Sequence, residues 1–65
     1  MARELQISLA SARVNAKLTQ EDVAKKLKIS KQTVVNWEKG KGEPSVNQAK
    51  ELSELYNISL DNIRF

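Results

Sequence analysis

The residues from Lys31 to Asn36 combine amine and amide side chains, with no aspartate or glutamate among them. Lysine can donate to the acceptors of guanine, whereas glutamine and asparagine carry the paired donor and acceptor that adenine requires in the major groove. An exposed β-branched residue would suit the methyl group of thymine. The principal candidates for base contacts are therefore Lys31, Gln32 and Asn36, with Thr33 and Val35 as secondary ones. The alternative is that a short helix simply exposes these residues to solvent.

The composition removes most catalytic chemistries. The chain has no cysteine and no histidine, which excludes disulfides, zinc fingers, and Ser-His or Cys-His nucleophilic pairs. A mechanism that uses carboxylates alone remains conceivable, but the eight acidic residues all fit surface or capping positions. We therefore expect no enzymatic activity, no cofactor, no metal and no small-molecule ligand.

The net charge of +3 and the pI of about 9.5 favour an anionic partner. No apolar run approaches membrane-spanning length, and the chain opens in a helical pattern without a signal-peptide core. These features predict a cytoplasmic protein without a membrane partner. With 65 residues, the chain is expected to form a single domain over 1–65, near the lower size limit for a core without disulfides or metals.

Two short helices are predicted to position the candidate base contacts. Thr19 and Asp22 have the spacing of a capping box, which predicts a helix over residues 19–27. Ser30 is a favourable N-cap, and it predicts a second helix over residues 30–39. The candidate base contacts all lie on this second helix.

The connection between the two helices consists of Lys28 and Ile29. Because it is so short, the helices must cross steeply with Ile29 between them, and Lys28 is expected to have a left-handed backbone. Val34 and Trp37 lie three residues apart and should face the core, which makes base stacking by the tryptophan the less favoured alternative. This arrangement predicts a helix-turn-helix.

Apolar stripes and capping residues predict three further helices. One is expected over residues 3–16, one begins after Ser45 and ends at a left-handed Asn57, and a short last helix runs from Leu60 to about Arg64. Their inward-facing residues should be Leu5, Leu9, Ala12, Val14 and Ala16, then Val46, Ala49, Leu52, Leu55 and Tyr56, then Leu60 and Ile63. We find no strand pattern. The expected fold is all-α, a compact orthogonal bundle of about five short helices.

Taken together, these residues resemble the Cro and phage-repressor type of helix-turn-helix domain, which is lambda-repressor-like and of the XRE family. With Leu5, Leu9 and Arg13, the resemblance covers nearly the whole chain. The shared residues are Leu18-Thr19-Gln20, Val23-Ala24, Leu27, Ile29-Ser30, Val34, Trp37-Glu38, Gly40, Pro44-Ser45 and Ile58-Ser59-Leu60-Asp61.

The resemblance implies a sequence-specific transcriptional regulator of phage or bacterial type. Such a repressor would bind a two-fold operator in double-stranded DNA as a homodimer, through the helix over 30–39. In the family, a glutamine at the place of Gln20 contacts a phosphate and the first residues of the third helix. An arginine at the place of Arg13 pairs with the glutamate at the place of Glu38; the alternative is that both are solvated charges.

Two lysines beyond the third helix, Lys39 and Lys41, are predicted to hold phosphates together with nearby backbone amides. The alternative for each is ordinary solubilising charge. The alternative for the whole chain is an antitoxin-like or adaptor module that binds a protein. A basic membrane-surface segment is disfavoured by the well-formed helix caps. The chain fits both a complete Cro-sized protein and the N-terminal domain of a longer repressor.

Overall fold

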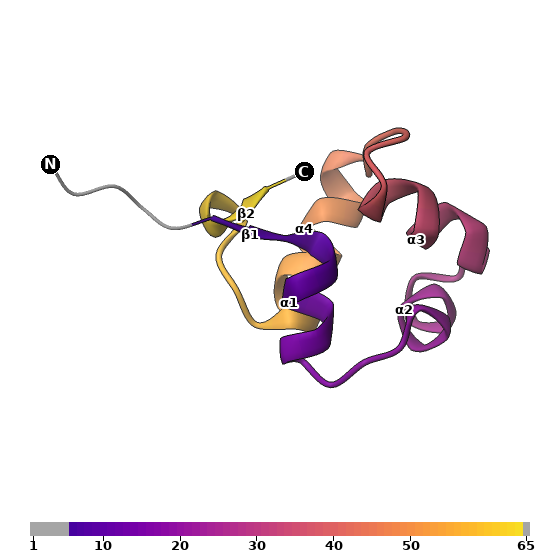
Figure 1. The fold of residues 1–65 in the computed structure, drawn as a ribbon, viewed down its shortest axis with the longest axis horizontal. Coiled ribbons are helices and arrows are strands. Elements are labelled where there is room, and N and C mark those ends of the chain that lie inside the picture. The colour runs from indigo at the N-terminus through magenta and orange to yellow at the C-terminus, as the bar shows by residue number, and fades with distance from the viewer. Residues whose placement is uncertain (1–5, 65) are drawn as a thin grey trace, which may run out of the picture.

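A computed structural model describes residues 6–64 of the chain. Within these residues the chain forms four α-helices, one 3₁₀ turn and two short strands (Figure 1). The elements are α1 (Leu9–Asn15), α2 (Gln20–Leu27), α3 (Lys31–Glu38), α4 (Val46–Tyr56) and η1 (Leu60–Asn62). The all-α class is confirmed, but the predicted fifth helix is only the 3₁₀ turn.

A small parallel strand pair, which we did not predict, joins the two ends of the described chain. β1 (Ile7–Ser8) lies beside β2 (Ile63–Arg64), with Ile7 opposite Ile63. Consequently α1 starts at Leu9 and not at residue 3. Its N-cap is Ser8, whose side-chain oxygen accepts the backbone N–H of Ser11. Residues 1–5, which the prediction placed partly in this helix, lie outside the described residues.

The core draws on α1 to α4 and on β2. Trp37 is only 8% exposed, so its predicted place in the core is confirmed. The buried residues are Leu9, Ala12, Val23, Ala24, Val34, Trp37, Leu52, Tyr56 and Ile63.

Two valines that were predicted to face inward are exposed instead. Val14 is 60% exposed and Val46 is 72% exposed. With 3.6 residues per turn, Val14 lies about 160° around its helix from buried Ala12, and Val46 lies about 120° from buried Leu52. The helix phase that buries Ala12 and Leu52 therefore turns both valines away from the core.

Left-handed residues end three of the helical segments. Lys28 has φ 61° and Asn57 has φ 54°, which confirms both predictions. Lys17 has φ 62° as well, just before Leu18. Each of these residues reverses the chain in the space of a single residue, so the next helix can begin at a steep angle.

Candidate nucleic-acid interface

The helix-turn-helix is built by local hydrogen bonds at both ends of α2. Thr19 Oγ1 accepts the backbone N–H of Asp22 at 3.0 Å, and Asp22 Oδ2 accepts that of Thr19 at 2.9 Å. The bond from the Thr19 backbone lowers the pKa of the Asp22 carboxyl, so this cap keeps its charge at neutral pH. At the other end, the N–H of Ile29 donates to the carbonyl of Ala24 at 3.0 Å, across left-handed Lys28. The capping box and the turn thus fix the direction in which α3 leaves.

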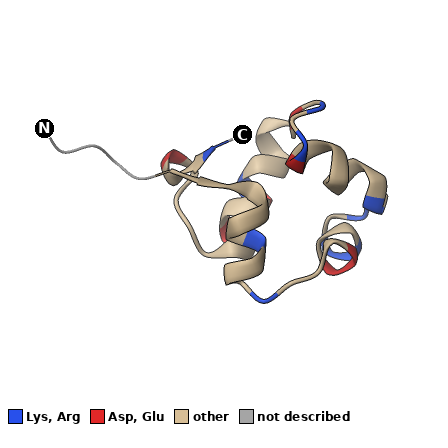
Figure 2. Ribbon diagram, in the orientation of Figure 1, with Lys and Arg blue, Asp and Glu red and all other residues tan. Residues whose placement is uncertain are grey.

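α3 turns Val34 and Trp37 into the core and leaves the candidate base contacts on its other sides. Lys31 and Gln32 are exposed. Thr33, Val35 and Asn36 are half-buried, so Val35 is less accessible than we predicted. Figure 2 shows a basic residue at the start of α3 and no acidic one before its last residue.

Two of these candidates are bonded to each other. Gln32 Nε2 donates to Asn36 Oδ1 at 3.0 Å, one helical turn further along α3. The Thr33 hydroxyl lies 2.9 Å from the Ser30 hydroxyl, and the Thr33 backbone N–H donates to Ser30 Oγ, which caps the helix. Thr33 is therefore engaged at the cap, whereas Gln32 and Asn36 form a unit on the surface.

Arg13 and Glu38 form a partly buried ion pair that links α1 to α3. Arg13 Nε donates to Glu38 Oε2 at 2.7 Å, and the two side chains are 16% and 8% exposed. Arg13 Nη1 also donates to the carbonyl oxygen of Leu18 at 2.9 Å. The hydrogen bond to Glu38 raises the pKa of Arg13 further above its ordinary value. The Arg13 guanidinium therefore stays charged at physiological pH.

Gln20 joins this pair instead of the start of α3. Its Nε2 donates to Glu38 Oε1 at 2.9 Å, so the Gln20 amide contacts the last residue of α3. The resemblance had implied a contact with the first residues of that helix. Glu38 Oε1 accepts this bond beside a longer one from Arg13 Nη2 at 3.3 Å, while Glu38 Oε2 accepts the shorter bond from Arg13 Nε. Among the described residues, the Gln20 side-chain oxygen and its second N–H have no hydrogen-bond partner, and of these two only the N–H could donate to a phosphate.

Tyr56 lies close to the same ion pair. Burial, and then the negative charge of Glu38, raise the pKa of Tyr56 to about 12, which the charge of Arg13 only partly offsets. The phenol is thus neutral at physiological pH. We did not predict this neighbourhood, because no local spacing connects residue 56 of α4 to residue 13 of α1.

The loop after α3 carries the two lysines predicted to contact phosphates. Lys39 and Lys41 are both exposed. The N–H of Lys41 donates to the carbonyl of Asn36 at 2.8 Å, and Gly40 and Gly42 have φ of 80° and 107°. Because the backbone of Lys41 is held against the end of α3, its side chain starts from a fixed point beside the candidate base contacts.

Lys31, the first residue of α3, forms a long ion pair with Glu21 of α2. Lys31 Nζ is 4.0 Å from Glu21 Oε2, and both side chains are more than half exposed. A pair so long and so solvated contributes little to stability. Lys31 is therefore available for another anion.

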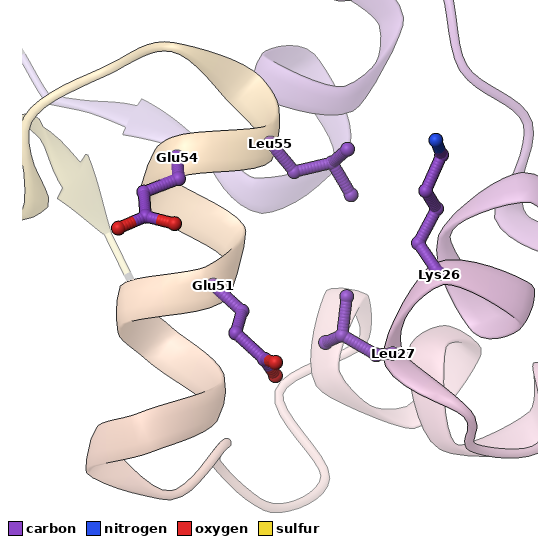
Figure 3. Close-up of a pocket in the computed structure, with 5 residues that line it drawn as sticks. All are labelled: Lys26, Leu27, Glu51, Glu54 and Leu55. Carbon is purple, nitrogen blue, oxygen red and sulfur yellow. The ribbon is translucent and has the colours of Figure 1, made fainter.

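A hollow of about 290 Å³ between α2 and α4 contains none of the predicted site residues. Figure 3 shows Leu27 and Leu55 on its two walls with charged side chains around them, and the full lining is Lys26, Leu27, Glu51, Glu54 and Leu55. Its mixed charges do not favour an anionic ligand. Within residues 6–64, no helix is long and apolar enough to cross a membrane.

Comparison with known proteins matches this architecture. The family model described as Helix-turn-helix matches residues 9–63. An uncharacterised HTH-type transcriptional regulator of Methanocaldococcus jannaschii is 44% identical over 46 residues, 71% of this chain and 70% of the relative. The HTH-type transcriptional activator BcrR of Enterococcus faecalis is 32% identical over 60 residues, 92% of this chain but only 29% of the activator.

A third relative, an uncharacterised HTH-type transcriptional regulator of Archaeoglobus fulgidus, is 33% identical over 51 residues, which cover 78% of this chain and 72% of the relative. The matched residues 9–63 include all four α-helices and the ion pair between Arg13 and Glu38. The chain therefore belongs to the helix-turn-helix family, of the XRE type.

Proposed function

We propose that this protein binds double-stranded DNA sequence-specifically and regulates transcription, with α3 in the major groove. The observation that carries the proposal is the surface of α3. It presents Lys31, Gln32 and Asn36 with no acidic residue before Glu38, while Val34 and Trp37 anchor the helix in the core. Amide and amine groups on an anchored helix are suited to the donors and acceptors of base edges.

Phosphate contacts complete the proposed interface. Lys39 and Lys41 extend the basic surface beyond the end of α3, and Gln20 with the start of α2 would lie against the DNA backbone. Contacts of this kind position a protein on the duplex and carry no sequence information. They account for affinity, and the side chains of α3 account for specificity.

One domain of this size reads only a few base pairs, so we propose that two copies bind a two-fold operator. The two half-sites would lie one helical turn apart, roughly 34–36 Å. Repression is the simplest form of regulation for such a domain, because an occupied operator excludes other proteins without a further contact. In the relative named an activator, more than two thirds of the length lies outside the region that matches this chain.

The experiment that tests this proposal compares two kinds of variant on two kinds of DNA. A preferred site is first selected from a random duplex pool, and each protein is then titrated with that site and with random duplex at two salt concentrations. Gln32→Ala and Asn36→Ala should each weaken binding to the preferred site by about 1–3 kcal/mol and change binding to random duplex little.

Lys41→Ala is the matched variant for the phosphate contacts. It should weaken binding to both duplexes alike and lower the salt slope by roughly one unit per half-site, because a released counterion carries no sequence information. Circular dichroism checks that every variant is folded. If neither kind of variant altered DNA binding, the proposal would fail, and a protein-binding role on the same fold would replace it.

A further inference from the structure

The bond between Gln32 and Asn36 decides which groups α3 can offer to a base. A glutamine amide has one oxygen and two N–H groups. One N–H of Gln32 is donated to Asn36 Oδ1 at 3.0 Å. The Gln32 oxygen and its other N–H are left. Gln32 is exposed, so both groups are open to a ligand.

Asn36 is the more buried member of the pair, and its backbone is held at the end of α3. It is half-buried, and its backbone carbonyl accepts the N–H of Lys39 at 3.1 Å and that of Lys41 at 2.8 Å. A terminal amide torsion is broad and nearly two-fold, so an unrestrained glutamine would exchange its oxygen and nitrogen freely. Because Asn36 Oδ1 can only accept, it stabilises the orientation in which Gln32 directs nitrogen toward it. In this structure the bond therefore holds the Gln32 nitrogen toward Asn36 before any DNA binds.

We infer that Gln32 and Asn36 act as one unit that recognises adenine, with Gln32 in contact with the base and Asn36 as the residue that positions it. This inference rests on the proposed function and assigns a base and a division of roles to the same site. In the major groove adenine presents the N7 acceptor beside the N6 donor, which match the free N–H and oxygen of Gln32. Guanine presents two acceptors, so one of them would face the Gln32 oxygen and remain unpaired.

The test selects duplexes from a random pool with the wild type and with Gln32→Ala, Asn36→Ala and Asn36→Asp, and reads base frequencies by sequencing. The wild type should enrich adenine at one position per half-site, by roughly 5- to 150-fold over guanine, which corresponds to a single bidentate contact. Gln32→Ala and Asn36→Ala should both lose this preference at the same base pair. Loss of the preference at the same base pair in both variants would show that Gln32 and Asn36 recognise one base together.

Asn36→Asp and Lys41→Ala are the matched controls. The aspartate retains an oxygen that accepts from Gln32, so it should keep adenine at that position while its charge weakens binding to every sequence. Lys41→Ala should reduce affinity without changing any base frequency. Circular dichroism verifies folding, which a surface substitution to alanine in a helix is expected to preserve.

Three results would overturn the inference. If Asn36→Ala lost a preference at a different base pair and kept adenine at the Gln32 position, Asn36 would contact a base of its own. If the position lost in Gln32→Ala were guanine in the wild-type selection, the assigned orientation would be wrong. In both cases the proposed function would stand. If the wild type enriched no sequence, the proposed function would fail, and the inference with it.

Discussion

At the scale of single residues, Glu38 is the point at which three helices meet. It belongs to α3, and its carboxylate accepts hydrogen bonds from Arg13 of α1 and from Gln20 of α2. A carboxylate that is only 8% exposed depends on such partners, because an unpaired charge at this depth is costly. The network therefore sets the position of α3 relative to the rest of the molecule.

Removing either member of the ion pair should destabilise the fold. We expect Arg13→Ala and Glu38→Ala each to lower the free energy of unfolding by roughly 1–4 kcal/mol, because each leaves a partly buried charge unpaired. The double variant should lose less than the sum, since each single change already removes the interaction. Urea unfolding of the four proteins measures this cycle. Strictly additive losses would show that the two charges are not coupled.

Sequence reasoning anticipated Arg13 and Glu38 but not the place of Gln20. The ion pair could be predicted because both residues have fixed spacing from the core residues Leu18 and Trp37 in a known pattern. A glutamine in the first turn of a helix has three free side-chain torsions and several acceptors within reach. Only the packed structure shows that the partner of Gln20 is Glu38 Oε1, which also accepts from Arg13.

At the scale of secondary-structure elements, the starts of the helices were the most predictable feature. The capping boxes of Thr19 with Asp22 and of Ser45 with Gln48 are both formed, and Ser30 caps α3 as expected. Such caps depend on side chains three residues apart, so the local sequence determines them. The first helix was predicted six residues too early, because its apolar stripe continues into a segment that pairs with β2 instead.

Two lysines in left-handed conformations offer a test at this scale. Lys17→Gly and Lys28→Gly should leave the free energy of unfolding unchanged or raise it by up to about 1 kcal/mol. Glycine removes the clash of Cβ at positive φ, which more than compensates for its greater freedom in the unfolded chain. Lys17→Ala and Lys28→Ala serve as controls, since they remove the charge and retain Cβ. Urea unfolding in which glycine is clearly worse than alanine at either position would contradict this account.

At the scale of the whole molecule, the strand pair is the feature that local patterns could not predict. Each strand has only two residues, far too few for an alternating pattern, and the partners are 56 positions apart in the chain. What identifies them is the tertiary packing of Ile63, which is 3% exposed and was expected in a helix. The helix caps, the helix-turn-helix and most of the core followed from residue types and spacing, because those depend on neighbours within one or two turns.

The contact between β1 and β2, which joins the two ends of the described chain, should stabilise the whole fold. We expect Ile63→Ala to lower the free energy of unfolding by about 2–5 kcal/mol, because it removes a buried aliphatic side chain at the contact that joins the two ends. In a domain of this size such a loss is a large part of the total. Val46→Ala is the control, since an exposed valine should change stability by less than about 0.5 kcal/mol. Equal effects of the two substitutions in thermal unfolding would show that the strand pair is dispensable.

The parallel pairing of β1 and β2 also brings the two ends of the described chain into one small region. β1 begins at Ile7 and β2 ends at Arg64, at opposite ends of the strand pair and away from α2 and the first turn of α3 (Figure 1). Two copies joined from the Arg64 end of one to the Gln6 end of the next would need a flexible linker of about 40 residues to have an average span near one turn of DNA. The second copy would then bind at the high local concentration that tethering provides, without any contact between the two protein surfaces.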